Sequence, residues 1–289
     1  MGAGGGPGPV VQRRRLRAEL RRVRVAAGLT QDEVAEAMDW SLSKLIRIEN
    51  GSVSISTNDL KAILQYYKIT DSHRVADLVA MGRVARERWW WSEYRDVASR
   101  ELLQLIEYEA AATISRNFQL SVVPGLLQTE EYARAVLERN NPQRPRDQLD
   151  VLVGIRMRRQ ELLDRADPPL LFFVMDEAVV RRQVGGPAVM RGQLQRLIEV
   201  SAKPNVTVEM VPFSAGIHPG TLGSFVIYEF PDDADDDTVY LENQQGEFLN
   251  RDDPDEIVAY RERFEQLREL SLGRAGTENF LAEAAKEVA

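Results

Sequence analysis

The chain has 289 residues, of which 44% are hydrophobic, so it can bury a sizeable core and is long enough for two domains. It contains no cysteine, which excludes disulfides, thiol catalysis and cysteine-ligated metals and suits a reducing cytoplasm. No run of 18 apolar residues occurs, so no membrane span is predicted. We therefore expect a cytoplasmic protein without a membrane partner.

The net charge of −8 is divided unevenly along the chain. Residues 1–88 carry 15 basic and 10 acidic side chains, a net charge of +5, whereas residues 89–289 carry 22 and 35, a net charge of −13. A basic segment can contact DNA phosphates, while an acidic remainder disfavours wholesale binding to them. The pattern favours a local DNA contact near the N-terminus.

The N-terminus is rich in glycine and proline, and we interpret residues 1–10 as a disordered tail. A helix is predicted from about residue 11 to residue 27, because Leu16, Leu20 and Val23 recur at spacings of four and three. Arginines crowd its other faces. They are interpreted as a solvated charged surface or, near the helix start, as an arm that reaches phosphates.

The stretch from Leu29 to Gly51 has the pattern of two short helices joined by a turn. Thr30 and Glu33 form a capping box at the first helix, and Ser41 can cap the second. Such a pair makes a helix-turn-helix, whose second helix enters the DNA major groove. The polar residues that this second helix presents away from its apolar face are Ser43, Lys44 and Arg47.

Two further helices are predicted from a second capping box at Ser56 and Asp59 and from a cap at Asp71. The sequence thus predicts five helices by about residue 88. We place a DNA-binding domain at residues 11–88 and a second domain at residues 89–289.

The letters LTQDEVAEAM, followed by SLSKLIRIENG, strongly resemble the lambda-repressor-like (Xre-type) helix-turn-helix family over roughly residues 11–69. The resemblance implies that Gln31 and Asn50 contact the DNA backbone, which sets register without reading sequence. It also implies a structural ion pair between Arg24 and Glu49. The residues expected to read bases are Leu42, Ser43, Lys44 and Arg47. Of these, Arg47 can contact guanine in bidentate fashion.

An aromatic group follows at the domain junction, composed of Trp89, Trp90, Trp91 and Tyr94. Aromatic side chains of this kind can form a hydrophobic plug between two domains. They are also enriched at ligand pockets and partner-binding patches. The sequence is compatible with both interpretations.

The second domain mixes helical and strand patterns. Helices are expected near residues 99–112 and 253–272, and a buried strand at 170–175. Strands are also indicated by the β-branched and aromatic content of PNVTVEMVPF, LGSFVIYEF and TVYLE. Their irregular order relative to the helices favours an α+β fold.

This second domain also carries familiar motifs: W-W-x-x-Y, VPGLLQTEEYA, R-x-x-R-Q-E-L-L, the Asp176-Glu177 pair and PNV-x-V-x-x-x-PFSAG-x-H. They resemble a domain of unassigned biochemistry that follows an Xre-type head in transcription regulators of GC-rich bacteria. The match covers roughly residues 90–272. The resemblance implies that a small protein, encoded by a neighbouring gene, docks on this domain and alters DNA binding. It supplies no catalytic residues.

An enzymatic reading has little support in the sequence. His218 lies near Ser214, but we expect no third group to orient its imidazole, and a turn explains these residues better. The glycines match no phosphate-binding loop or dinucleotide motif. The aspartates at residues 232, 233 and 235–237 lack the calcium-loop register and are interpreted as a solvated acidic hairpin. We predict no enzyme activity, no metal and no cofactor.

The sequence therefore predicts a transcription regulator, more specifically a repressor that binds double-stranded DNA as a homodimer on an inverted repeat. Its second domain is expected to sense a small partner protein or a ligand. Two alternatives remain open. One is an interaction protein whose head only locates it on DNA. The other is an antitoxin-like protein that neutralises its small neighbour and represses its own operon.

Overall fold

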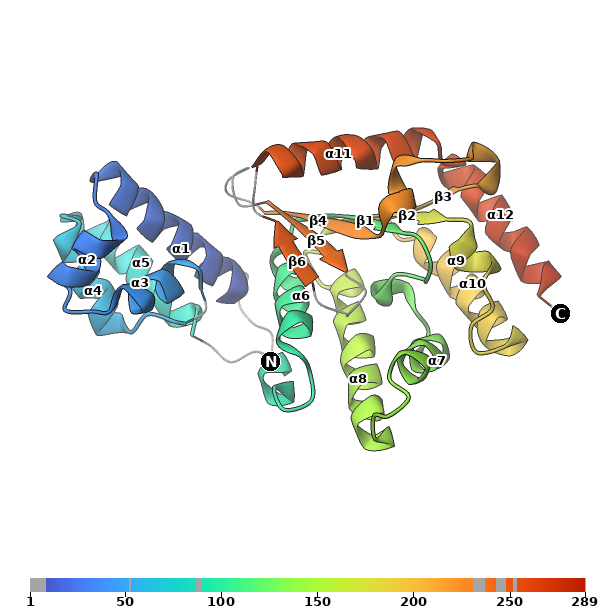
Figure 1. Ribbon diagram of the computed structural model, residues 1–289, viewed down its shortest axis with the longest axis horizontal. Coiled ribbons are helices and arrows are strands. Elements are labelled where there is room, and N and C mark those ends of the chain that lie inside the picture. The colour runs from blue at the N-terminus through green and yellow to red at the C-terminus, as the bar shows by residue number, and fades with distance from the viewer. Residues whose placement is uncertain are drawn as a thin grey trace. The chain divides into compact units, whose positions relative to one another are not determined.

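The computed structural model describes residues 9–51, 53–86, 90–230, 237–242, 248–251 and 254–288. The chain divides into two compact units, Met1–Ser92 and Glu93–Ala289. We call them the N-terminal unit and the C-terminal unit and describe each by itself (Figure 1). The glycine-rich stretch at residues 1–8 lies outside the described residues.

The N-terminal unit consists of α1 (Pro9–Ala26), α2 (Gln31–Ala37), α3 (Leu42–Glu49), α4 (Thr57–Tyr66) and α5 (Ser72–Val84). The helices begin where the sequence supplies caps, because Thr30 and Glu33 form the reciprocal capping box and Ser41 accepts the Lys44 N–H. Helix α1 begins at Pro9, two residues before the predicted start, since proline is well tolerated in a first helical turn. The predicted all-α fold is confirmed.

These helices enclose one apolar core. It is formed by buried residues that include Leu16, Leu20, Val34, Leu45, Ile48, Leu60, Ile63, Leu64 and Leu78. The apolar positions of the helix-turn-helix, Val34 in α2 and Leu45 in α3, are fully buried. Burial of these positions sets the rotation of α3 about its axis and therefore which of its residues face solvent.

The C-terminal unit is built on a mixed sheet in the order β3-β2-β1-β4-β5-β6. The strands are β1 (Ile114–Gln119), β2 (Leu170–Asp176), β3 (Val206–Val211), β4 (Phe225–Glu229), β5 (Thr238–Glu242) and β6 (Phe248–Arg251). β1, β2 and β3 run parallel, whereas β4, β5 and β6 pair antiparallel to their neighbours. The predicted α+β class is confirmed.

Helices cover both faces of this sheet (Figure 1). They are α6 (Arg100–Ala111), α7 (Glu130–Asn140), α8 (Arg146–Arg159), α9 (Ala178–Arg181), α10 (Pro187–Ser201), α11 (Pro254–Glu269) and α12 (Gly273–Glu287). On one face α11 packs Phe264 and Leu267 against Phe118 of β1. On the other, α10 and α12 pack against β2 and β3 around Phe173 and Met210.

Side chains alternate between the two faces along each strand. In β1, Phe118 points toward α11, so Asn117 and Gln119 lie on the opposite face. There they neighbour residues of β4 such as Val226, the direct partner of Asn117. The middle strand of the sheet therefore carries polar side chains on the face that α11 does not cover.

Candidate nucleic-acid interface and polar centres of the C-terminal unit

Helix α3 presents a solvent-exposed face in the N-terminal unit. Its buried side is formed by Leu45 and Ile48, and Ser43 and Arg47 are exposed on the rest of the helix. Leu42 is 37% exposed, which is high for a large apolar side chain at a helix start. Ser43 and Arg47 are four residues apart and so share one face. This face has the position and polarity that major-groove contact needs.

Lys44 is only partly exposed, whereas the other predicted base-reading residues of α3 are exposed. Its Nζ is 3.2 Å from Oδ2 of Asp59 in α4 and 4.0 Å from the centre of the Trp40 ring. Asp59 thus pairs with Lys44, in addition to giving its backbone N–H to Ser56. Both partners are substantially exposed, so the pair contributes only about 0–1 kcal/mol. Lys44 can exchange it for a contact to DNA at little cost.

A polar cluster joins α1, α2 and α3 through the carboxylate of Glu49. Arg24 donates from Nε and Nη2 to the two Glu49 oxygens at 2.7 and 3.0 Å, and its Nη1 donates to the Leu29 carbonyl at 2.9 Å. Gln31 donates from Nε2 to Oε2 of Glu49 at 2.7 Å. The hydrogen bonds to Glu49 raise the pKa of the Arg24 guanidinium. The cluster holds the helix-turn-helix in place against α1.

Of the two predicted phosphate-contacting residues, Gln31 belongs to this cluster and Asn50 follows Glu49 directly in the chain. Gln31 gives one amide N–H to Glu49 and carries a second N–H on the same nitrogen, which a phosphate oxygen can accept. Asn50 is exposed at the C-terminal cap of α3. The following Gly51 has a positive φ of 76°, and a Cβ there would lie 2.6 Å from Nη1 of Arg17. The positive φ thus favours glycine where the chain leaves α3.

The described members of the aromatic group differ in their burial. Trp91 is buried, and Trp90 and Tyr94 are half-buried in a short 3-10 helix, Trp90–Tyr94. The rings of Trp90 and Trp91 meet edge to face, with centroids 5.5 Å apart. Trp89 lies outside the described residues.

A buried ion pair lies in the interior of the C-terminal unit, and no pattern in the sequence indicates it. Arg159, at the end of α8, donates from Nε and Nη2 to the two carboxylate oxygens of Glu109 in α6 at 2.8 and 2.6 Å. Both side chains are under 9% exposed. Burial alone would lower the pKa of Arg159, but the attraction and hydrogen bonds of Glu109 outweigh it and raise that pKa. The pair connects two helices 50 residues apart in the chain.

The expectation that no third group orients His218 is wrong. Nε2 of this buried histidine is 3.0 Å from Oδ2 of Asp176 at the end of β2, and Nδ1 accepts the Gly220 N–H at 3.2 Å. Because Nδ1 accepts a hydrogen bond from Gly220, Nε2 is the ring nitrogen that donates a hydrogen bond to Asp176. The two hydrogen bonds of the ring thus fix the loop that follows β3 to the end of β2. Ser214 is exposed in a separate 3-10 turn, Phe213–Ala215.

The braced loop from Phe213 to Gly223 exposes large apolar side chains. Ile217 is 90% exposed, Leu222 86% and Phe213 57%. The loop is nevertheless held firmly, because Glu177 accepts the Phe213 N–H at 2.8 Å and His218 is anchored on Asp176. Apolar side chains presented on a fixed backbone are typical of a surface that binds another molecule.

Substitution of Gly220 by alanine is expected to destabilise the C-terminal unit by about 1–3 kcal/mol. An added Cβ would lie 2.3 Å from ring carbons of Phe118, which is itself fully buried and has little room to move. Thermal denaturation followed by circular dichroism measures the effect. Gly192→Ala is the control, because nothing lies within 4 Å of a Cβ on that exposed glycine of α10. A similar loss of stability in both variants would contradict the packing argument.

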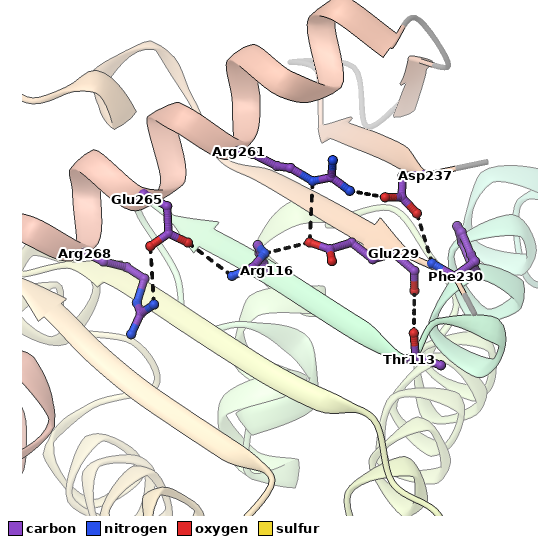
Figure 2. A network of polar contacts seen from close by, with 8 residues as sticks. All are labelled: Thr113, Arg116, Glu229, Phe230, Asp237, Arg261, Glu265 and Arg268. Atoms are coloured by element: carbon purple, nitrogen blue, oxygen red, sulfur yellow. Dashed lines mark hydrogen bonds and ion pairs between the residues drawn. The ribbon is translucent and has the colours of Figure 1, made fainter. Parts of the chain in front are cut away.

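A chain of charged side chains ties α11 to its face of the sheet (Figure 2). Arg116 of β1 bonds Glu229 of β4 at 2.7 Å and Glu265 of α11 at 3.2 Å. Asp237 accepts the Phe230 N–H at 3.0 Å and pairs with Arg261 of α11. Asp237 is buried, so its assignment to a solvated hairpin is wrong. The other aspartates of that stretch lie outside the described residues.

No group of three or more histidine, aspartate or glutamate side chains in the described part of the chain could hold a metal ion. Among the helices whose residues are described, each is too short or too polar to cross a membrane.

The two units together define the class of the protein. A helical unit with a helix-turn-helix, followed by an α+β unit, is the architecture of a helix-turn-helix regulator, and residues 15–78 match the helix-turn-helix domain family. Residues 102–283, more than half of the chain, match the family described as a domain of unknown function, DUF5753. The chain therefore belongs to the DUF5753 family. Comparison with curated proteins and with solved structures found no match.

Proposed function

We propose that this protein is a sequence-specific transcription regulator of the Xre type, with a DNA-binding domain at residues 11–88 and a regulatory domain at residues 89–289. The observation that carries the proposal is the exposed face of α3, where Ser43 and Arg47 stand beside Leu42. The basic charge of residues 1–88 supports it. Because its target is DNA, we place it in the cytoplasm.

In this proposal Leu42, Ser43, Lys44 and Arg47 read base edges in the major groove. Gln31 and Asn50 hold the flanking phosphates, one at the start of α2 and the other at the end of α3. A single domain of this size reads few bases, so we propose a homodimer on an inverted repeat with half-sites one helical turn apart. Occupation of a promoter by such a dimer would repress transcription.

Replacement of Arg47 by alanine is expected to weaken binding to the preferred site roughly 5- to 150-fold while changing nonspecific binding little, because a bidentate contact to guanine contributes about 1–3 kcal/mol of discrimination. Asn50→Ala should weaken both kinds of binding alike, since phosphate contacts carry no sequence information. Fluorescence anisotropy with a selected site and with random duplex, at one fixed salt concentration, measures both.

Arg83→Ala is the matched control for Arg47, because this arginine is also exposed but lies at the end of α5. It removes the same charge from the N-terminal unit without touching α3. If Arg47→Ala and Arg83→Ala lower specific and nonspecific binding by the same factor, Arg47 does not read bases.

The regulatory half of the proposal concerns a small partner protein encoded by a neighbouring gene. The exposed apolar side chains of the braced loop, Phe213, Ile217 and Leu222, support a protein contact there. The same observation favours the second candidate function, an antitoxin-like protein that neutralises this partner and represses its own operon. Sequencing the DNA retained by the purified protein, with and without the neighbour's product, separates the two. An antitoxin-like protein would retain mainly its own promoter.

A further inference from the structure

The C-terminal unit contains a cavity of about 170 Å³. It lies against β1, β4 and β5 on the face of the sheet that α11 does not cover, and residues of α6, α7 and α8 enclose it. An engineered protein cavity of about 150 Å³ accommodates benzene, so this one has room for roughly six to ten non-hydrogen atoms. The lining includes both apolar and strongly polar side chains, the composition typical of a ligand site.

Asn117 is the most informative residue of this lining. It lies in the middle of β1, where its direct partners are Phe173 of β2 and Val226 of β4, both apolar. Its buried Oδ1 has no hydrogen-bond partner among the described residues. A buried carbonyl oxygen without a hydrogen-bond partner destabilises the fold, so its presence needs a structural reason. A 180° turn of the amide exchanges its oxygen and nitrogen. A hydroxyl on the ligand would satisfy either orientation, because it both donates and accepts.

The charged side chains among the described lining residues are Glu109, Arg156 and Arg159. Arg159 is held by Glu109 through two hydrogen bonds. Arg156 lies at the same wall and donates from Nη1 to Gln128 at 2.9 Å. A planar guanidinium in this position is suited to a carboxylate.

The remainder of the wall is apolar and aromatic. Its apolar residues include Leu102, Leu105, Val123, Leu126, Leu137 and Val226. Tyr228 and Tyr240 belong to the same wall, and burial raises the pKa of the Tyr228 hydroxyl well above its ordinary value. A ligand with an apolar body between its two polar ends would fit these surroundings.

We infer that this cavity binds a small monocarboxylic acid with an apolar body and a hydroxyl group, the carboxylate at Arg156 and the hydroxyl at Asn117. The inference deepens the proposed regulation and depends on it only for the consequence that the ligand has for DNA binding. Occupation of the cavity would connect α6, α8 and the sheet through one molecule.

Calorimetric titration of the full chain with 4-hydroxybenzoate, in the absence of DNA, tests the inference. We expect saturable binding at one site per chain. Benzoate, which lacks the hydroxyl, and 4-hydroxybenzyl alcohol, which lacks the carboxylate, should each bind at least about tenfold more weakly. Absence of saturable binding by 4-hydroxybenzoate, or equal binding of all three compounds, would overturn the inference. Neither result bears on the DNA-binding proposal, which the anisotropy measurements test separately.

Two variants test which protein residue contacts the carboxylate of the ligand and which contacts its hydroxyl. Arg156→Met should weaken 4-hydroxybenzoate binding at least about tenfold, whereas Arg158→Met, on the exposed side of the same helix, should not change it. Asn117→Leu should remove the preference for 4-hydroxybenzoate over benzoate. It should also raise the melting temperature of the unliganded protein, since a buried carbonyl oxygen without a partner is replaced by an apolar group of similar shape. A lower melting temperature in Asn117→Leu, or unchanged binding in both variants, contradicts the assignment.

Discussion

Replacement of Glu109 by alanine is expected to lower the free energy of unfolding of the C-terminal unit by roughly 3–5 kcal/mol. The substitution leaves the Arg159 guanidinium buried without the carboxylate that accepts two of its N–H groups. In a domain of this size the loss corresponds to a fall in melting temperature of roughly 6–20 °C, which differential scanning calorimetry measures.

The control for this prediction is Glu278→Ala in α12. Glu278 also pairs with an arginine, Arg274, but both side chains are more than 40% exposed, so the expected change is about 0–1 kcal/mol. The double substitution Glu109→Leu with Arg159→Met should recover most of the lost stability, because it removes both buried charges and fills their volume with apolar atoms. A double variant as unstable as Glu109→Ala would show that packing, and not the unpaired charge, causes the loss.

Replacement of Arg24 by methionine is expected to destabilise the N-terminal unit by roughly 3–5 kcal/mol. Glu49 would keep its hydrogen bond from Gln31 but lose two from Arg24, and its side chain is only 5% exposed. The contact between α1 and the carbonyl of Leu29, just before α2, would be lost as well. Urea denaturation followed by circular dichroism measures the change in the transition of this unit.

DNA binding gives this prediction a second measurement. Arg24 is not among the residues proposed to touch DNA, so Arg24→Met should still recognise the preferred site at low temperature and lose it on warming. Arg22→Met is the matched control, because Arg22 lies on the same helix and pairs with Glu19 at an exposed position. If Arg24→Met binds DNA poorly even where circular dichroism shows it fully folded, Arg24 contributes to the interface directly.

The helix-turn-helix could be predicted well because its signals are local. A capping residue and its N–H partner are three positions apart, as for Thr30 and Glu33, and helical periodicity depends on spacings of three and four. The exposure of Ser43 and Arg47 follows from the burial of Leu45 and Ile48 on the same two turns. For Arg24 and Glu49, 25 residues apart, only the resemblance to a known family indicated a contact.

The polar centres of the C-terminal unit could not be predicted in the same way. His218 and Asp176 are 42 residues apart, and a pattern of single letters does not say that the end of β2 lies beneath the loop that follows β3. Asp237 looked like one of a run of solvated acids because its partner, Arg261, lies in a helix much later in the chain. Charge and composition describe a segment, whereas burial depends on what packs over it.

The sequence by itself determined the five N-terminal helices, their caps, the apolar face that buries α3 and the α+β character of the remainder, since each depends on residues within a few positions of one another. Only the tertiary structure decided the strand order β3-β2-β1-β4-β5-β6, the ion pair between Glu109 and Arg159, and the cavity beside Asn117. These features arise where strands and helices distant in the chain meet. Their stability depends on desolvation and on hydrogen bonds that form only after the sheet and its helices have packed together.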